Sequence, residues 1–118
     1  MPEPSRRPHV VVVDDSRFHR EFARQVLQDE ADVECCENAE QALRALERAP
    51  VDLVLSDLTM PGLSGLELLS RVQREHPGTD FVLITAHASI DSAVKALRMG
   101  ATDYIQKPIR AEDLILVV

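Results

Sequence analysis

Residues 51–65 read VDLVLSDLTMPGLSG, and this stretch decides the fold. Its first half is almost entirely apolar up to Ser56 and Asp57. A short apolar run bounded by turn residues is typical of a strand buried on both faces of a parallel sheet. The Pro61-Gly62 pair indicates a loop after it. We therefore predict a strand over Val51 to Ser56, with Asp57 at its carboxyl end, where open α/β sheets place their ligand sites.

Composition and charge exclude several classes of protein. The chain has 118 residues, which suits one domain, and 45% of them are hydrophobic, which is ordinary for a packed core. A net charge of −7 argues against a nucleic-acid-binding surface and suits a protein that holds a cation. No stretch matches a membrane span or a secretory signal, so we expect a cytoplasmic protein without membrane contact.

The two cysteines, Cys35 and Cys36, are adjacent in the chain. Neighbouring cysteines rarely bridge each other, and two are too few for a metal cage or a disulfide framework. We interpret them as small residues of the core or of an edge strand in a reducing compartment.

Five short apolar runs alternate with amphipathic segments along the chain. The predicted strands are His9 to Val13, Val33 to Cys36, Val51 to Ser56, Phe81 to Thr85 and Asp103 to Gln106. Apolar residues at helical spacing follow each strand. The first stripe runs through Glu30 and consists of Phe18, Phe22, Ala23, Val26 and Leu27. The others contain Ala39, Ala42, Leu43 and Leu46, then Leu66, Leu69 and Val72, then Ile90, Ala93, Val94 and Leu97, with a last helix from Ala111 to Val118.

Capping residues mark several ends of these helices. Asn38 is an N-cap, with Gln41 spaced for a capping box, and Pro50 ends the same helix. Ser89 caps the fourth helix, and Gly100 stops it.

Strand and helix alternation with short connections predicts an α/β fold with a parallel sheet and helices on both faces. Right-handed crossovers leave few topologies, and the flavodoxin-like, doubly wound five-stranded order 2-1-3-4-5 is common at this length. We expect residues 1–8 to form a flexible tail and residues 9–118 to form the domain, whose fifth helix looks truncated.

Polar side chains with useful chemistry stand where four of the strands end, namely Asp14 and Asp15, Asp57, Thr85, and Lys107. Because carboxyl ends of parallel strands share one edge, we expect these side chains to converge. Crowded carboxylates repel one another unless a cation intervenes, and Mg²⁺ prefers carboxylates, waters and a phosphate.

A carboxylate nucleophile, a metal site, an ammonium and a hydroxyl together indicate phosphoryl transfer onto an aspartate. Each feature alone is weak evidence, because the Asp pair is also a common helix cap, the threonine a common structural residue and the lysine a common solvated one. Their joint occurrence at four strand ends favours the functional interpretation.

The sequence resembles the receiver domain of bacterial two-component response regulators over nearly its whole length. The matching segments are VVVVDDS at 10–16, DLVLSDLTMPGLSGLELL at 52–69, VLITAHASI at 82–90 and GATDYIQKPI at 100–109. The resemblance implies a CheY-like fold and a module that catalyses its own phosphotransfer and slow autodephosphorylation, rather than an enzyme acting on other substrates.

The resemblance also implies roles for the residues around the acidic strand ends. Asp57 would be the phosphoacceptor, and it would ligate Mg²⁺, or Mn²⁺ in its place, together with Asp15 and the backbone carbonyl of Thr59. Asp14 would act largely through water. Thr59 and His87 occupy positions that tune dephosphorylation in the family, although a plain loop histidine is an equal reading of His87.

The resemblance implies contacts with the phosphoryl group, and a switch residue, near the ends of the last two predicted strands. Thr85 would hydrogen-bond the phosphoryl group, and Lys107 would pair with it, with a cis peptide between Lys107 and Pro108. Tyr104 would be the aromatic switch residue that follows Thr85 inward on phosphorylation. The alternative for Tyr104 is a half-buried strand tyrosine.

Residues 85–108, TAHASIDSAVKALRMGATDYIQKP, look most like receivers of the NtrC-type activators. Those regulators continue into an ATPase that works with an alternative sigma factor and then into a DNA-binding domain. The resemblance implies a sensor histidine kinase and the chain's own effector domains as partners, and a homodimer through the fourth helix, fifth strand and fifth helix. No direct contact of this domain with nucleic acid is expected. We expect the apolar residues Ile90, Val94, Leu97 and Met99 to be mostly core.

Three alternatives stay open. A haloacid-dehalogenase phosphatase needs Asp-x-Asp, but Ser16 and Thr59 stand where its acid would be. A flavodoxin-type flavin module needs a phosphate-cradling loop and stacking aromatics, whereas this loop is acidic and the chain has one tyrosine and no tryptophan. A pseudo-receiver that is never phosphorylated is disfavoured by the intact set of acidic and basic residues.

Overall fold

The computed structural model describes residues 7–86 and 90–118, which form one sheet covered by helices on both faces. The strands are all parallel and lie in the order β2-β1-β3-β4-β5, as predicted. In chain order the elements are β1 (His9–Val13), α1 (Arg17–Leu27), β2 (Asp32–Cys36), α2 (Ala39–Arg48), β3 (Leu53–Asp57), α3 (Gly65–Glu75), β4 (Asp80–Thr85), α4 (Ile90–Arg98), β5 (Asp103–Gln106) and α5 (Ala111–Val117).

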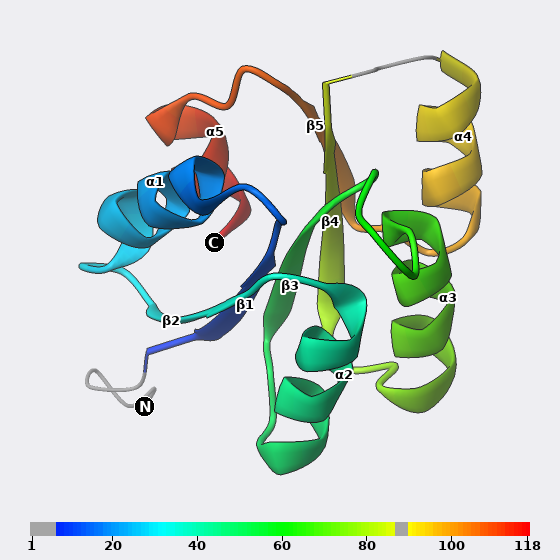
Figure 1. The fold of residues 1–118 in the computed structure, drawn as a ribbon, viewed down its shortest axis with the longest axis horizontal. Helices are drawn as coiled ribbons and strands as arrows, with labels where there is room; N and C mark the ends of the chain where they lie inside the picture. Colours follow the sequence, from blue (N-terminus) through cyan, green and yellow to red (C-terminus); the bar gives the residue numbers. More distant parts are fainter. Residues whose placement is uncertain (1–6, 87–89) are drawn as a thin grey trace, which may run out of the picture.

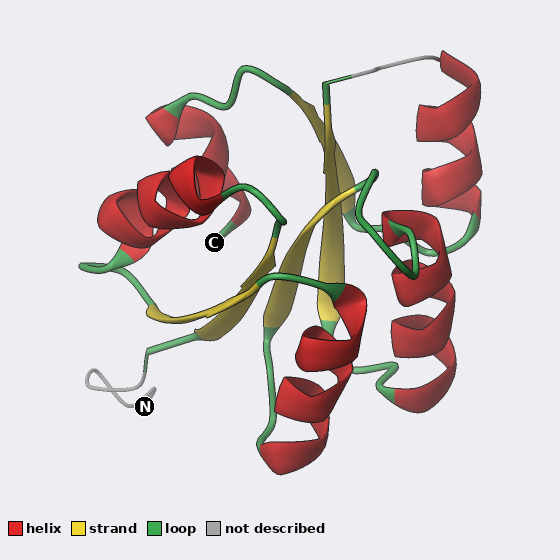
Figure 2. Cartoon of the chain, in the orientation of Figure 1, coloured by secondary structure: helices red, strands yellow, loops and turns green. Residues whose placement is uncertain are grey.

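The helices are divided between the two faces of the sheet (Figure 1; Figure 2). α1 and α5 cover one face, and α2, α3 and α4 cover the other. Alternate side chains of a strand point to opposite faces of the sheet. Because helices cover both faces, the side chains of the central strands are buried on both sides. In β1, Val10 and Val12 pack in the cluster below α1 and α5, whereas Val11 and Val13 pack in the cluster below α2 and α3. This two-sided burial explains why the strands read as continuous apolar runs.

Element bounds agree with the predictions for β1 and β5 and differ slightly elsewhere. β3 begins at Leu53, later than predicted, and extends to Asp57, so the predicted site residue is the last residue of the strand. α1 ends at Leu27 rather than continuing to Glu30, because the backbone N–H groups of Glu30 and Ala31 both bond to the Leu27 carbonyl in a turn.

Side chains cap the helices where the sequence predicted them, with one change. Asn38 Oδ1 accepts from the Gln41 N–H at 2.9 Å, but Gln41 Oε1 accepts from the N–H of Glu37 rather than that of Asn38. A complete capping box that was not predicted joins Ser64 and Glu67 at the start of α3. The predicted cap Ser89 lies outside the described residues, and Gly100, at φ +104°, follows the end of α4 as expected.

Phe18 was predicted in the buried stripe of α1, and that prediction was wrong, because the residue is 75% exposed. Leu27 follows Phe18 by two and a half turns at 3.6 residues per turn, so the two side chains lie on opposite sides of the helix. Ala23 and Leu27 form the buried face.

The apolar residues of α4 are also less buried than predicted. Val94 is 40% exposed and Leu97 is 50% exposed, while the buried residue of this helix is Ala96. The reason is position, since α4 contacts the edge strand β5 and presents only a narrow face to the sheet. Ile90 and Met99 complete the predicted set; Met99 is half-buried, and the Ile90 side chain lies outside the description.

Two residues assigned to the expected tail have partners in the fold. Arg7 forms an ion pair with Asp32 at 3.0 Å and donates to the Ala31 carbonyl at 2.7 Å. The Pro8 carbonyl accepts from the Asp32 N–H at 2.9 Å. These contacts fix the chain two residues before β1.

The cysteines lie on the edge strand β2 as expected, and neither is in a disulfide. Cys36 is buried, and this burial raises the pKa of its thiol to about 11. Its thiol therefore stays protonated at neutral pH. Within the part of the chain that the structure describes, no helix has the length and apolar character needed to cross a membrane.

Candidate functional site

The strand ends bring the predicted polar side chains together. Asp14, Asp15 and Asp57 each offer a carboxylate oxygen within 4.8 Å of the others. Lys107 Nζ lies 3.2 Å from Asp14 Oδ2 and 3.5 Å from Asp57 Oδ1. Thr85 is buried at the end of β4, and its carbonyl accepts from the Lys107 N–H at 2.8 Å. The predicted convergence at this edge of the sheet is confirmed.

Strand register explains why these residues meet. Val13 pairs with Ser56, so the residues that follow, Asp14 and Asp57, stand side by side at the ends of β1 and β3. Asp57 pairs with Ile84, and Thr85 pairs with Gln106. Each pairing places the polar residue at or one step beyond the last ladder position. The site therefore follows from the topology, with no special loop needed to assemble it.

The backbone of Asp57 is held closely from the side of α3. Gly65 is the first residue of α3, and its N–H donates to the Leu58 carbonyl at 2.8 Å. A Cβ on Gly65 would lie 2.4 Å from the Asp57 carbonyl oxygen, so the strand and the helix approach too closely for any side chain. Ser56 Oγ donates to the same carbonyl at 2.9 Å. These contacts fix Asp57 in position.

Asp14 is fixed by the start of α1. Its Oδ1 accepts from the Ser16 N–H at 2.9 Å, and its carbonyl accepts from Arg20 Nη1 at 2.8 Å. Ser16 is the N-cap of α1. Asp14 is buried while Asp15 is exposed. The pair therefore consists of one carboxylate within the protein and one open to solvent.

The electrostatics of the site leave room for a cation. Burial and the neighbouring Asp14 carboxylate raise the pKa of Asp57, and the Lys107 ammonium opposes them. Three carboxylates facing one ammonium leave excess negative charge. Carboxylate oxygens without nitrogen or sulfur ligands are the donor set that a hard divalent ion such as Mg²⁺ requires. The residues present therefore fit such an ion.

The other predicted residues occupy different surroundings. Thr59 is exposed in the loop after β3. Tyr104 is half-buried on β5 and packs against the cluster under α2 and α3. Its hydroxyl is buried and has no hydrogen-bond partner within residues 7–86 and 90–118. The peptide bond between Lys107 and Pro108 is cis, as predicted. His87 lies outside the described residues.

His19 belongs to the site, although it was not among the predicted residues. Its Nδ1 lies 3.3 Å from Lys107 Nζ and 3.6 Å from Asp14 Oδ2. His19 is in the first turn of α1, just after the Ser16 cap. The sequence could have indicated this residue, because His19 is polar and stands in the helical turn that follows the Asp14-Asp15 pair. That turn begins at the same edge of the sheet as the site.

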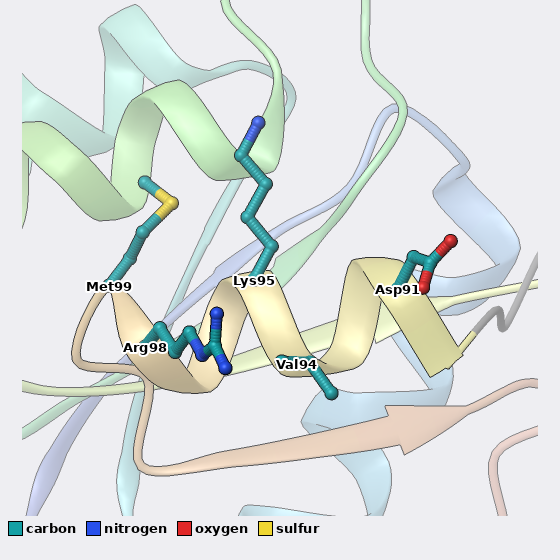
Figure 3. Close-up of a pocket in the computed structure, with 5 residues that line it drawn as sticks. All are labelled: Asp91, Val94, Lys95, Arg98 and Met99. Atoms are coloured by element: carbon teal, nitrogen blue, oxygen red, sulfur yellow. The ribbon is translucent and has the colours of Figure 1, made fainter.

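A hollow of about 500 Å³ lies along α4, away from the strand ends. It is lined by Asp91, Val94, Lys95, Arg98 and Met99 (Figure 3). Lys95 and Met99 extend to one side of α4, and Val94 points away from them. None of the predicted phosphorylation residues lines it, so the hollow is separate from the acidic site.

Comparison with known proteins identifies the family. The sequence model of the response regulator receiver domain matches residues 10–118. The chain belongs to the response regulator receiver domain family. This membership agrees with the fold and the acidic strand ends, and it replaces the phosphatase and flavodoxin alternatives.

Relatives and solved structures place this receiver near the NtrC-type regulators, as predicted. Over 104 residues, 87% of the chain, it is 38% identical to the response regulator protein PilR of Pseudomonas aeruginosa and covers 23% of that protein. It is 39% identical to the DNA-binding transcriptional regulator NtrC of Escherichia coli over 82 residues, which are 70% of the chain and 18% of NtrC. The receiver domain of NtrX from Brucella abortus superposes with a TM-score of 0.85 at 38% identity, covering 92% of each chain.

The receiver thus spans about a fifth of the length of these curated regulators. It is a signalling module of two-component systems related to transcriptional regulators.

Proposed function

We propose that the receiver accepts a phosphoryl group from a sensor histidine kinase onto Asp57. One observation carries the proposal: the Asp57 carboxylate stands in a cluster of three carboxylates, 3.5 Å from the Lys107 ammonium, at the carboxyl ends of the neighbouring strands β1 and β3. An oxygen nucleophile beside a fixed positive charge suits phosphoryl transfer, which depends on positioning and on neutralising charge.

In the proposed step, an Asp57 carboxylate oxygen forms a bond to the phosphorus atom of a phosphohistidine. The bond from phosphorus to the imidazole nitrogen breaks, and its electron pair stays on that nitrogen, which takes a proton from water. The Lys107 ammonium pairs with the transferred phosphoryl oxygens, and the Thr85 hydroxyl donates to one of them. Hydrolysis of the acyl phosphate by water then returns free Asp57.

A divalent ion would be held by Asp15, Asp57 and the Thr59 backbone carbonyl, with Asp14 acting through water. Mg²⁺ fits this donor set, and Mn²⁺ can replace it. When bound, the ion supplies positive charge next to the phosphoryl oxygens. Thr59 and His87 occupy positions from which side chains can influence the water that attacks the acyl phosphate.

The proposed output is a change on the face formed by α4, β5 and α5. The buried Tyr104 hydroxyl has no partner in the described part of the chain, and an unpaired buried hydroxyl costs about 1–3 kcal/mol. Because the unpaired hydroxyl makes the resting position of Tyr104 costly, movement of its ring together with Thr85 would shift an existing conformational equilibrium of this face. Exposed Val94, Leu97 and Leu116 on this face suit a homodimer or an effector domain.

As part of the same proposal, residues 9–118 act as a cytoplasmic receiver that makes no contact with nucleic acid itself. Effector domains of the same protein would carry the transcriptional output, since the relative NtrC is a DNA-binding transcriptional regulator.

The test is the intact mass of the protein after incubation with acetyl phosphate and Mg²⁺. We expect one added phosphoryl group that is lost over time, and that is absent in Asp57→Asn and after addition of EDTA. Stoichiometric labelling of Asp57→Asn would refute the site assignment. No labelling of the wild type by either acetyl phosphate or a phosphorylated kinase would identify a pseudo-receiver.

A further inference from the structure

The Lys107 ammonium has three acceptors around it, and one of them is His19. Lys107 Nζ lies 3.2 Å from Asp14 Oδ2, 3.3 Å from His19 Nδ1 and 3.5 Å from Asp57 Oδ1. An ammonium group carries three N–H donors, so the contacts match its donors in number. Of these partners, His19 is the one without a role in the reaction proposed above.

The direction of the His19 contact follows from the chemistry of lysine. Because an ammonium only donates, Nδ1 accepts, and the ring proton is on Nε2. Nδ1 also lies 3.6 Å from Asp14 Oδ2, which is farther than its 3.3 Å distance from Lys107. One nitrogen cannot both accept from the ammonium and donate to the carboxylate. The shorter contact decides, so His19 and Asp14 both accept from Lys107.

The surroundings make the lost acceptor hard to replace. The Lys107 side chain is 12% exposed, so an N–H without a partner there is poorly compensated by water. His19 is placed by the first turn of α1, where its own N–H donates to Ser16 Oγ at 3.4 Å. The acceptor is therefore presented from a fixed helical turn rather than from a loop.

We propose that His19 is a positioning residue that holds the Lys107 ammonium beside Asp57. Without the imidazole, the ammonium keeps two of its three partners, Asp14 at 3.2 Å and Asp57 at 3.5 Å, and its position is less well fixed. With the imidazole, the ammonium stays at a point from which it reaches the phosphoryl group on Asp57. The link to catalysis rests on the proposed function, whereas the contact between His19 and Lys107 does not.

The test uses lysine signals, because the chain contains two lysines, Lys95 and Lys107. Protein labelled with ¹³C and ¹⁵N in lysine gives two sets of side-chain NMR signals, and Lys95→Arg assigns them. Lys95 lies on exposed α4 (Figure 3) and serves as the internal reference.

Three variants separate the acceptor from the fold. His19→Leu removes the acceptor and keeps a side chain of similar bulk, and His19→Asn places an amide oxygen where Nδ1 was. His76→Leu makes the same change at the far end of α3. We expect the Lys107 signal to move in His19→Leu and to stay near its wild-type position in the other two. The Lys95 signal should stay in place in all three.

Phosphorylation by acetyl phosphate below saturation should slow about five-fold in His19→Leu, the size of one net hydrogen bond, and recover in His19→Asn. An unchanged Lys107 signal in His19→Leu would overturn the proposal, whatever the phosphorylation rate. A shifted signal with an unchanged rate would overturn the positioning role. If wild-type protein is not phosphorylated at all, the proposed function fails, and the lysine signals alone decide whether His19 holds Lys107.

Discussion

Replacing Gly65 with alanine tests whether the start of α3 is fixed against the strand that carries the site. The new Cβ would lie 2.4 Å from the Asp57 carbonyl oxygen, 2.9 Å from Leu58 Cα and 2.9 Å from Leu83 Cδ1. Ordinary contact begins at 3.4 Å, so the Cβ would be about 1 Å too close to the oxygen. The Asp57 and Leu58 atoms are backbone, and the Leu58 N–H bonds to the Ile84 carbonyl at 2.9 Å. They cannot yield without disturbing the β3–β4 ladder.

Because the strand cannot yield, α3 must back away from it. Overpacking of this kind costs about 1–3 kcal/mol, and loss of the hydrogen bond from the Gly65 N–H to the Leu58 carbonyl costs about 1 kcal/mol more. The expected loss in unfolding free energy is about 2–4 kcal/mol, a large part of the roughly 5–15 kcal/mol of a typical domain. The Tm should fall by roughly 8–16 °C. Loss of the close support that α3 gives to the Asp57 backbone should also slow phosphorylation of Asp57.

Urea denaturation of Gly65→Ala beside Gly78→Ala measures this effect with a matched control. A Cβ on Gly78 meets nothing within 4 Å, so the same change there should leave the midpoint nearly unchanged. Equal midpoints for the two variants would refute the reasoning, because they would show that α3 and β3 can separate without cost. A lower midpoint with unchanged phosphorylation would show that the contact stabilises the fold but does not place Asp57.

Other parts of the site and its support give predictions of different kinds. Burial and a neighbouring carboxylate raise the pKa of Asp57 above its ordinary 3.8. The contribution of Asp57 to the free energy of unfolding is therefore fully present below pH 3.8 and is lost as the pH rises through the raised pKa. Asp57→Asn should therefore raise the urea midpoint in metal-free buffer at pH 7 but not near pH 3; equal shifts at both would contradict this. Asp15→Ala should weaken Mg²⁺ binding at least about tenfold by calorimetry, while Lys107→Ala should not weaken it; equal losses would show the roles to be wrong. Ser64→Ala breaks the capping box with Glu67 and should cost about 1 kcal/mol in urea denaturation; no change would mean the box contributes nothing.

The sheet order and the meeting of the strand ends could be predicted from the sequence for a physical reason. Both depend only on the alternation of strands and helices and on the hand of the crossovers, not on details of packing. The residue after β1 and the last residue of β3 had to meet once those strands were neighbours. Even a two-residue error in the start of β3 left Asp57 at the correct edge.

The parts that could not be predicted depend on which way a helix is turned and how far it stands from the sheet. Phe18 fits the apolar row of α1, but the helix is rotated so that Ala23 and Leu27 face the sheet and Phe18 faces away from it. The same rotation brings His19 toward Lys107, and no motif marks that approach. The roles assigned to Thr85 and to the switch tyrosine stay predictions, since they concern a phosphorylated state.

The position of Lys107 links the stability of the resting site to its reactivity. Burial and the neighbouring Asp14 carboxylate raise the pKa of Asp57, and a protonated carboxyl is a poor nucleophile. Lys107 lowers the pKa of Asp57 and so favours the ionised form before any phosphoryl group arrives. In the proposed reaction, a phosphoryl group would then bring further negative charge to the same place, and the ammonium shared by two carboxylates would be drawn toward it. In that reaction, one side chain would therefore prepare the nucleophile and later stabilise the product, and an acceptor such as His19 that fixes its position would affect both steps.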